Sequence, residues 1–220
     1  MSTAEPSPSD SEKLAVNRPV QAWLLAAIAG SADAICLLLY DAFAGQMTGN
    51  TVLLALDLFK TDWWSAAYHL ALIGLFVLGL VGASAALRNA VSPGMVLIAS
   101  AMLVATAVQL PMRAPALVVA AAMGLQNAAA RRFGSLTLNT VFITGDLQAM
   151  ASALTDEDAG PPARMAGRAL AVLWASYLAG AVCGALLTRA TSYPLLATAA
   201  AMPLVLLLGT GWWRQRVRVR

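Results

Sequence analysis

The stretch from Val20 to Phe43, VQAWLLAAIAGSADAICLLLYDAF, decides the fold. It is almost wholly apolar, and Asp33, close to its centre, is its one charged residue before Asp41. A transmembrane helix needs about 20 predominantly apolar residues, within a range of about 17–25. The stretch therefore predicts a helix that crosses a membrane and carries a carboxyl group near the bilayer centre.

Five further runs of this kind follow along the chain. The six predicted spans are Val20–Phe43, Ala66–Leu87, Gly94–Leu110, Ala114–Ala130, Ala169–Thr188 and Leu195–Trp213. Two shorter apolar pieces, Gly49–Phe59 and Gly145–Leu154, would each extend about 15–17 Å, half the thickness of a bilayer. We expect an all-α polytopic membrane protein with about six transmembrane helices plus two half-length helices. An alternative in which both short pieces cross keeps the two termini on the same side.

The amino-acid composition excludes an ordinary soluble domain. Hydrophobic residues make up 60% of the 220 residues and charged residues 11%, with a mean hydropathy of +0.71, whereas soluble domains carry about a quarter charged residues. The net charge of +3 arises at the ends of the apolar runs and in the C-terminal tail, which suits a lipid bilayer and not nucleic acid. Cys36 and Cys183 lie singly inside apolar runs, so we expect no metal site. No motif indicates haem, flavin or nucleotide, and we expect no cofactor.

The basic residues predict the orientation, because Lys and Arg accumulate on the cytoplasmic side of membrane proteins. With six spans and a cytoplasmic N-terminus, Lys60, Arg113 and Arg189 fall on the outer side. The basic residues on the inner side are then Lys13, Arg18, Arg88, Arg131, Arg132, Arg164, Arg168, Arg214, Arg216, Arg218 and Arg220. We therefore expect a multi-pass protein with both termini in the cytoplasm, a disordered tail over residues 1–19 and a basic tail over residues 214–220.

The two halves of the chain resemble one another. Gly30-Ser31-Ala32-Asp33-Ala34 corresponds to Gly124-Leu125-Gln126-Asn127-Ala128 at an offset of 94, and Thr48-Gly49-Asn50 to Thr144-Gly145-Asp146 at an offset of 96. Gly79 and Arg88 correspond to Gly180 and Arg189 at an offset of 101. This order and spacing predict two membrane repeats, residues 20–110 and 114–213. Three spans in each would invert the second repeat relative to the first, as in many secondary transporters.

These motifs resemble the YoaK family of bacterial membrane proteins, a domain of unknown function. The resemblance rests on Asp33-Ala34, Gln46-Met47-Thr48-Gly49-Asn50-Thr51-Val52 and Gly124-Leu125-Gln126-Asn127-Ala128, with Thr144-Gly145-Asp146 in the second copy. It covers residues from about 20 to 212. The resemblance implies a protein of the bacterial cytoplasmic (inner) membrane and implies no particular activity.

Asp33 is the strongest candidate for a functional residue. A carboxylate at the bilayer centre costs a few kcal/mol, so such residues face a cavity or a partner. It is either neutral, which suits proton coupling, or ionised beside a cation, and the alternative is a purely structural hydrogen bond. Gln126 and Asn127 hold the matching place in the second half. We expect them near Asp33, either as hydrogen-bonded links between helices or as solute contacts in a shared polar cavity.

The Thr-Gly-Asn and Thr-Gly-Asp motifs open the two half-length helices. The polar side chains are expected to cap the helix N-termini and the glycines to ease the turns, or the free N–H groups there bind a solute. The residues concerned are Thr48, Gly49, Asn50, Thr144, Gly145 and Asp146. The Asp146 carboxylate would occupy its own helix end, so an anion would favour the Asn50 end.

The leading functional expectation is a small-molecule transporter or permease-like protein, with a polar cavity at Asp33, Gln126 and Asn127 that takes a small solute or a proton. The alternative is a non-transport membrane scaffold, sensor or channel-like protein, in which neighbours satisfy these polar groups. We expect no enzyme, because the chain has no HExxH, GxSxG or Cys–His pair and only one histidine, His69. Small residues predict close helix packing along two faces, Ser176-Gly180-Gly184 in the fifth run and Gly79, Gly82, Ala83 and Ala86 in the second. The sequence is compatible with an oligomer.

Overall fold

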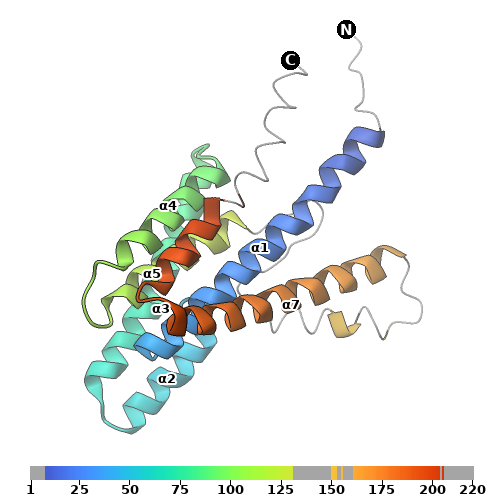
Figure 1. Cartoon of the computed structure of the whole chain (residues 1–220). Helices are drawn as coiled ribbons and strands as arrows, with labels where there is room; N and C mark the ends of the chain where they lie inside the picture. The colour runs from blue at the N-terminus through green and yellow to red at the C-terminus, as the bar shows by residue number, and fades with distance from the viewer. Residues whose placement is uncertain (1–7, 131–149, 153–154, 156–160, 204, 206–220) are drawn as a thin grey trace.

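The computed structural model of the chain describes residues 8–130, 150–152, 155, 161–203 and 205, which form helices and turns with no strand among them. The principal helices are α1 (Pro8–Tyr40), α2 (Met47–Phe59), α3 (Trp63–Arg88), α4 (Pro93–Ala107), α5 (Ala114–Ala129) and α7 (Pro161–Ala190) (Figure 1). A further helix covers Pro194–Pro203. The prediction of an all-α chain is confirmed for the described residues.

Three of these helices are long and apolar enough to cross a membrane, over Val20–Tyr40, Trp63–Arg88 and Gly167–Ala190. Two others, α4 and α5, have 15 and 16 residues and would extend about 22–24 Å at 1.5 Å per residue, less than the roughly 30 Å of the hydrocarbon core. The count of six spans stays a prediction. The second short piece, Gly145–Leu154, lies mostly outside the described residues.

Large apolar side chains cover much of the outer surface of the helices. The most exposed of them on α2 and α3 include Val52, Trp64, Leu70, Leu78 and Val81, each at least 56% accessible. A water-soluble monomer rarely exposes contiguous apolar surface on this scale. The exposed apolar faces therefore agree with the lipid contact that the composition predicts.

Helix α1 begins at Pro8, well before the apolar run at Val20. It thus includes much of the segment for which the sequence predicts a disordered tail. Glu12, Lys13, Leu14 and Ala15 are favourable helix formers, and a helix already nucleated in the span extends through them at little cost. Residues 1–7, the start of the predicted tail, lie outside the described residues, as does the basic tail.

Short connections join the first five helices. Ser92 caps α4 by accepting a hydrogen bond from the Met95 N–H (3.3 Å), and Pro93 occupies the first helical turn, where a missing N–H costs little. Asp62 caps α3 in the same way by accepting from the Ser65 N–H (3.1 Å). Hydrogen bonds from Ser65 lower the pKa of the exposed Asp62 carboxyl group. Ala90, between α3 and α4, has φ +63°, a left-handed conformation that suits glycine better.

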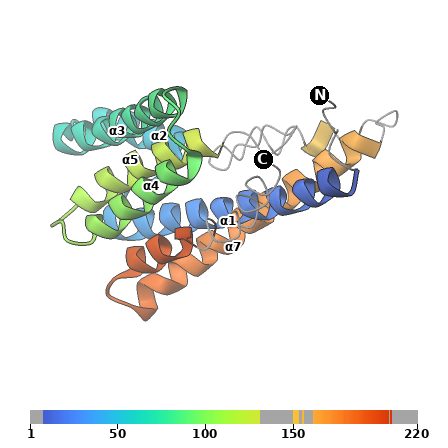
Figure 2. The same ribbon diagram turned by 90° about the horizontal axis from the view of Figure 1, so that it is seen from above.

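Two helix pairs, α1 with α7 and α3 with α5, lie side by side (Figure 2). In the first pair Gly30 lies so close to Tyr177 and Ala181 that a methyl group would overlap their backbone, and in the second Gly124 has the same relation to Phe76 and Leu80. The glycines differ by 94 positions (124 minus 30), and their partners differ by 101 (177 minus 76, and 181 minus 80). These are the offsets of the sequence repeat.

A second set of glycine contacts has the same spacing. Gly180 lies against the backbone of Ala27, and Gly79 lies against the backbone of Ala121. The expected packing role of Gly180 and Gly79 is thus confirmed. Gly82, which the sequence places on the same packing face of α3, has open space where a side chain would be.

Candidate functional site

Asp33 lies buried where α1, the start of α2 and α7 meet. Its Oδ1 accepts hydrogen bonds from the backbone N–H of Gly45 (2.6 Å) and of Gln46 (3.4 Å), and its Oδ2 accepts from the hydroxyl of Tyr177 (2.6 Å). The Gln46 amide donates in turn to the Tyr177 oxygen at 3.3 Å. Each of these partners of the carboxylate is a donor, and three elements are joined through one side chain.

Helix α2 begins at this carboxylate. After α1 ends at Tyr40, the chain turns back and places Gly45 and Gln46 against Asp33, so that α2 starts inside the bundle. A carboxylate at a helix N-terminus interacts favourably with the helix dipole and with its free N–H groups. The anion that this helix end can hold is therefore supplied by the chain itself.

The expected capping role of Thr48 and Asn50 is wrong. The residue at the start of α2 is Gln46, whose side chain makes no capping bond, and Thr48 is exposed one position inside the helix. The helix begins at Met47, so both residues lie inside it. The helix end is fastened instead by the carboxylate of Asp33, on another helix, which accepts from the N–H groups of Gly45 and Gln46 just before the first helical residue.

Asn50 and Gly49 instead hold the loop that precedes α2. Asn50 is fully buried, and its side chain accepts from the N–H of Phe43 (2.9 Å) and donates to the carbonyl of Phe43 (2.7 Å). The Phe43 ring packs on Gly49, where a methyl group would lie 2.7 Å from the ring carbon Cδ2. The Thr-Gly-Asn motif therefore positions Phe43, and through it the turn that carries Gly45 to Asp33.

Gln126 and Asn127 are both buried on α5. The Gln126 amide donates to the carbonyl of Leu25 on α1 (3.1 Å), and Oε1 of Gln126 is buried without a hydrogen-bond partner among the described residues. Leu25 precedes Asp33 by eight residues, or about 12 Å along the helix. The predicted grouping of Gln126 with Asp33 is therefore not found, because Gln126 meets α1 about two turns away. Thr144, Gly145 and Asp146 lie outside the described residues.

A cavity of about 290 Å³ lies between α1, α7 and the helix over Pro194–Pro203. Its lining is mostly apolar and includes Ala27, Gly180 and Cys183. The hydroxyls of Ser31 and Thr198, also in the lining, bond to each other at 3.1 Å. Asp33, Gln126 and Asn127 do not line this cavity, so it is not the polar cavity that the sequence predicts.

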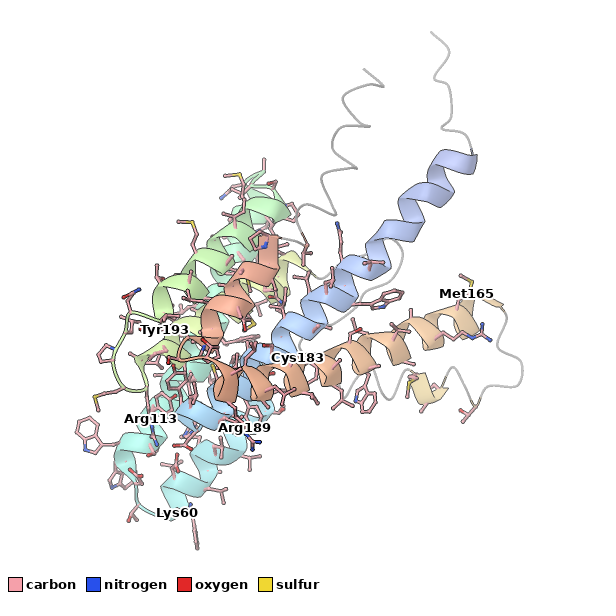
Figure 3. The ribbon with its side chains drawn as sticks, in the orientation of Figure 1. Lys60, Arg113, Met165, Cys183, Arg189 and Tyr193 are labelled. Atoms are coloured by element: carbon pink, nitrogen blue, oxygen red, sulfur yellow. The ribbon has the colours of Figure 1, made fainter. Side chains whose placement is uncertain are left out.

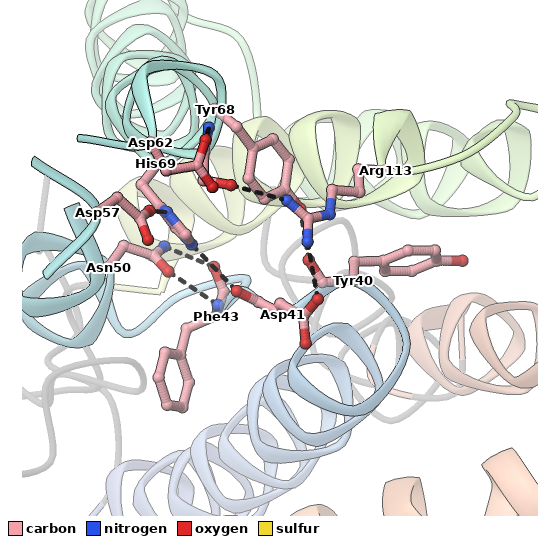
Figure 4. A network of polar contacts seen from close by, with 10 residues as sticks. Tyr40, Asp41, Phe43, Asn50, Asp57, Asp62, Tyr68, His69 and Arg113 are labelled. Atoms are coloured by element: carbon pink, nitrogen blue, oxygen red, sulfur yellow. Dashed lines mark hydrogen bonds and ion pairs between the residues drawn. The ribbon is translucent and has the colours of Figure 1, made fainter. Parts of the chain in front are cut away.

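A second polar cluster lies at the end of the bundle that carries Lys60 and Arg113 (Figures 3 and 4). His69 on α3 is buried, its Nδ1 lies 2.6 Å from Oδ2 of Asp57, and its Nε2 lies 3.0 Å from the carbonyl oxygen of Asp41. Arg113 donates to the Asp41 carboxylate at 2.9 Å, and its guanidinium lies 5.3 Å from the centre of the Tyr68 ring. Sequence reasoning missed this cluster, because Asp41 and Asp57 are separated from His69 by 28 and 12 positions.

No metal site is found in the described part of the chain, where no three His, Cys, Asp or Glu side chains are grouped so as to hold an ion. Cys36 is buried and Cys183 is exposed, each as a free thiol. The two polar clusters consist of carboxyl, hydroxyl, amide, imidazole and guanidinium groups, which can form hydrogen bonds and ion pairs and exchange protons.

The comparisons with known proteins identify a family but no individual relative. A family model described as "Protein of unknown function (DUF1275)" matches residues 21–209. Neither the search of curated proteins nor the search of solved structures gave a match. The matched residues include every side chain of both polar clusters.

Proposed function

The chain belongs to the DUF1275 family, and from its geometry we propose that it is a small-molecule transporter or permease-like protein of the bacterial cytoplasmic membrane. The observation that carries the proposal is the start of α2. A helix too short to span begins inside the bundle, at a buried carboxylate that also bonds to α7. Interrupted helices whose ends meet a polar group near the membrane midplane form the binding sites of many secondary transporters.

The paired glycine contacts support an origin by duplication. The contact of Gly30 with α7 and that of Gly124 with α3 are built from residues at the offsets of the repeat. In this proposal residues 20–110 and 114–213 form two inverted three-span repeats, and each first span packs against the second span of the other repeat. Asp33 and Tyr177 then lie on opposite repeats, so their bond opens or closes as the repeats move.

Protonation of Asp33 would change this contact. An ionised carboxylate accepts from all three donors, whereas a protonated carboxyl group must place its own O–H against an acceptor. Because the Gly45 N–H, the Gln46 N–H and the Tyr177 hydroxyl all point at it as donors, one of these bonds must then break or reverse. The donors so released suit a small anionic solute such as a carboxylate, which gives the proposal a proton-coupled form.

The test uses the full chain in liposomes loaded with a pH-sensitive dye. Pools of small carboxylates, amino acids and sugars are added outside, and solute-dependent movement of protons is followed. We expect at least one pool to move protons with the unaltered chain, and Asp33→Asn to abolish the movement. Asp62→Asn is the matched control, because Asp62 is an exposed capping residue. No movement with any pool, at either polarity of the pH gradient, would contradict transport.

The second candidate is a membrane scaffold, sensor or channel-like protein. It is favoured by one observation: all three donors to Asp33 come from the chain itself, and the cavity described above does not touch them. In that case Asp33→Asn lowers stability and moves no solute. We propose no enzymatic role, since the sequence carries no HExxH, GxSxG or Cys–His pair.

A further inference from the structure

The surroundings of His69 fix how many protons its ring and Asp57 share. A carbonyl oxygen only accepts hydrogen bonds, and so does an ionised carboxylate. Nε2 of His69 faces the Asp41 carbonyl at 3.0 Å, and Nδ1 faces the Asp57 carboxyl group at 2.6 Å. A neutral imidazole has one N–H and can donate to only one of them. Both contacts are satisfied only if the pair holds one proton more than a neutral histidine and an ionised aspartate.

We propose that His69 and Asp57 form a proton-binding site, with His69 as an imidazolium ion paired to the Asp57 carboxylate. The Nδ1–Oδ2 distance of 2.6 Å is short, as charge-assisted hydrogen bonds are. Both side chains are largely shielded, at 4% and 15% exposure. The ring cannot be turned over without placing carbon atoms against both oxygens, so the assignment does not depend on the choice of ring orientation.

The charges around the site agree with this arrangement. The Arg113 guanidinium neutralises the Asp41 carboxylate at 2.9 Å. The carbonyl of the same residue faces Nε2 of His69. Tyr68 stacks at a tilt beside His69, with ring centroids 5.2 Å apart, and donates its hydroxyl proton to the Tyr40 carbonyl. In the described part of the chain, the turn between α2 and α3 adds the charged groups of Asp62 and Lys60. Of the two groups that face His69, the Asp41 carbonyl only accepts hydrogen bonds, and the Asp57 carboxylate accepts in its ionised form.

The bound proton has a structural consequence. Asp41 is the first residue after α1 and has φ +55°, a left-handed conformation that aspartate tolerates. Its carbonyl is held by His69, and Gly45 at the far end of the same loop is held by Asp33. Loss of the proton leaves one ring nitrogen without a hydrogen to donate, and so frees either Asp41 or Asp57. The bound proton therefore fastens the loop before α2 to α3.

His69 is the only histidine in the chain, so ¹⁵N-histidine labelling reports on this one ring. The full chain in lipid nanodiscs is observed by NMR at pH 6. We expect two protonated ring nitrogens, one facing each of the two acceptors. A single protonated ring nitrogen at pH 6 in the folded protein would overturn the proposal.

Two variants sharpen the test. Asp57→Asn replaces the carboxylate with an amide that can donate a hydrogen to Nδ1, so the ring should become neutral while the Nε2 bond to Asp41 stays. Asp62→Asn removes a nearby exposed carboxylate that does not touch the ring, and should leave both ring protons in place. If Asp57→Asn keeps two ring protons, or if Asp62→Asn removes one, Asp57 is not the partner and the proposal fails. Neither readout depends on transport.

Discussion

The hydroxyl of Tyr177 donates a 2.6 Å hydrogen bond to the carboxylate of Asp33, and so joins two residues 144 positions apart. The bond connects the first long apolar helix to the last one described, at the point where α2 begins. A residue from each proposed repeat is thus held in one contact. The proposed movement of the two repeats depends on this contact more than on any other.

Removal of the Tyr177 hydroxyl should weaken the fold. Tyr177→Phe leaves Oδ2 of Asp33 without its donor, and hydrogen bonds to charged groups contribute about 1.5–3 kcal/mol. We expect a loss of that order in the free energy of unfolding, measured by denaturant titration in detergent micelles. Tyr193→Phe is the matched control, because Tyr193 is 58% exposed. Equal effects of the two substitutions would contradict a specific role for the Tyr177 bond.

The Asn50 side chain gives a test of the loop before α2. Asn50→Asp keeps the shape of the side chain and its acceptor, but an ionised aspartate cannot donate to the Phe43 carbonyl. We expect a loss of about 1–3 kcal/mol, the cost of a buried group left unpaired. Thr48→Ala, at an exposed neighbouring position, should change the unfolding free energy by less than about 0.5 kcal/mol. If Asn50→Asp leaves the free energy of unfolding unchanged, the two bonds to Phe43 do not hold the loop.

Much of the fold could be predicted from the sequence, since hydrophobic runs and their ends fix helices directly. The helices α2 to α5 begin and end within a few residues of the predicted runs, and Pro93 opens α4 as expected. The start of α1 differs because helix propensity continues beyond the apolar run. Span counts could not be settled in this way, because α4 and α5 lie near the lower limit of length.

The candidate site could be predicted only in part. Asp33 stands out in sequence because a carboxyl group in an apolar run is costly. Its partners do not, since Tyr177 is an ordinary residue of a membrane helix and the donors of Gly45 and Gln46 are backbone groups. The His69 cluster was missed for a similar reason. The Asp41 group that binds His69 is a carbonyl, which every residue has.

Two glycines of α3 offer a paired test of helix packing. A methyl group at Gly79 would overlap the backbone of Ala121, whereas one at Gly82 would meet open space. We expect Gly79→Ala to lower the midpoint of thermal unfolding in micelles, with a cost of about 1–3 kcal/mol for an overpacked contact. Gly82→Ala should be neutral or stabilise by up to about 1 kcal/mol, because alanine favours the helix. A larger loss of stability for Gly82→Ala than for Gly79→Ala would contradict the packing of α3 on α5.

The turn between α3 and α4 should be improved by glycine. Ala90 is exposed and has φ +63°, and this left-handed conformation costs a residue with a Cβ atom about 1–2 kcal/mol. Glycine removes this cost, but its greater freedom in the unfolded chain offsets part of the stabilisation. Ala90→Gly should therefore stabilise the fold by about 0.5–1 kcal/mol. Ala86→Gly, inside α3, should destabilise by about 1 kcal/mol. A destabilising Ala90→Gly in the same melting assay would be inconsistent with the turn as described.

The most direct test of the central claim is whether water reaches the start of α2 in the working protein. Gln46→Cys is placed in a chain that lacks Cys36 and Cys183, and a membrane-impermeant thiol reagent is added to one side of the liposomes or the other. This substitution keeps Asp33, Tyr177 and the backbone N–H of position 46. If the site opens during transport, position 46 labels from at least one side, and Asp33→Asn changes the labelling rate. A thiol at position 46 that stays unreactive from both sides, while a thiol at the exposed position of Lys60 labels fully, would contradict the transporter account.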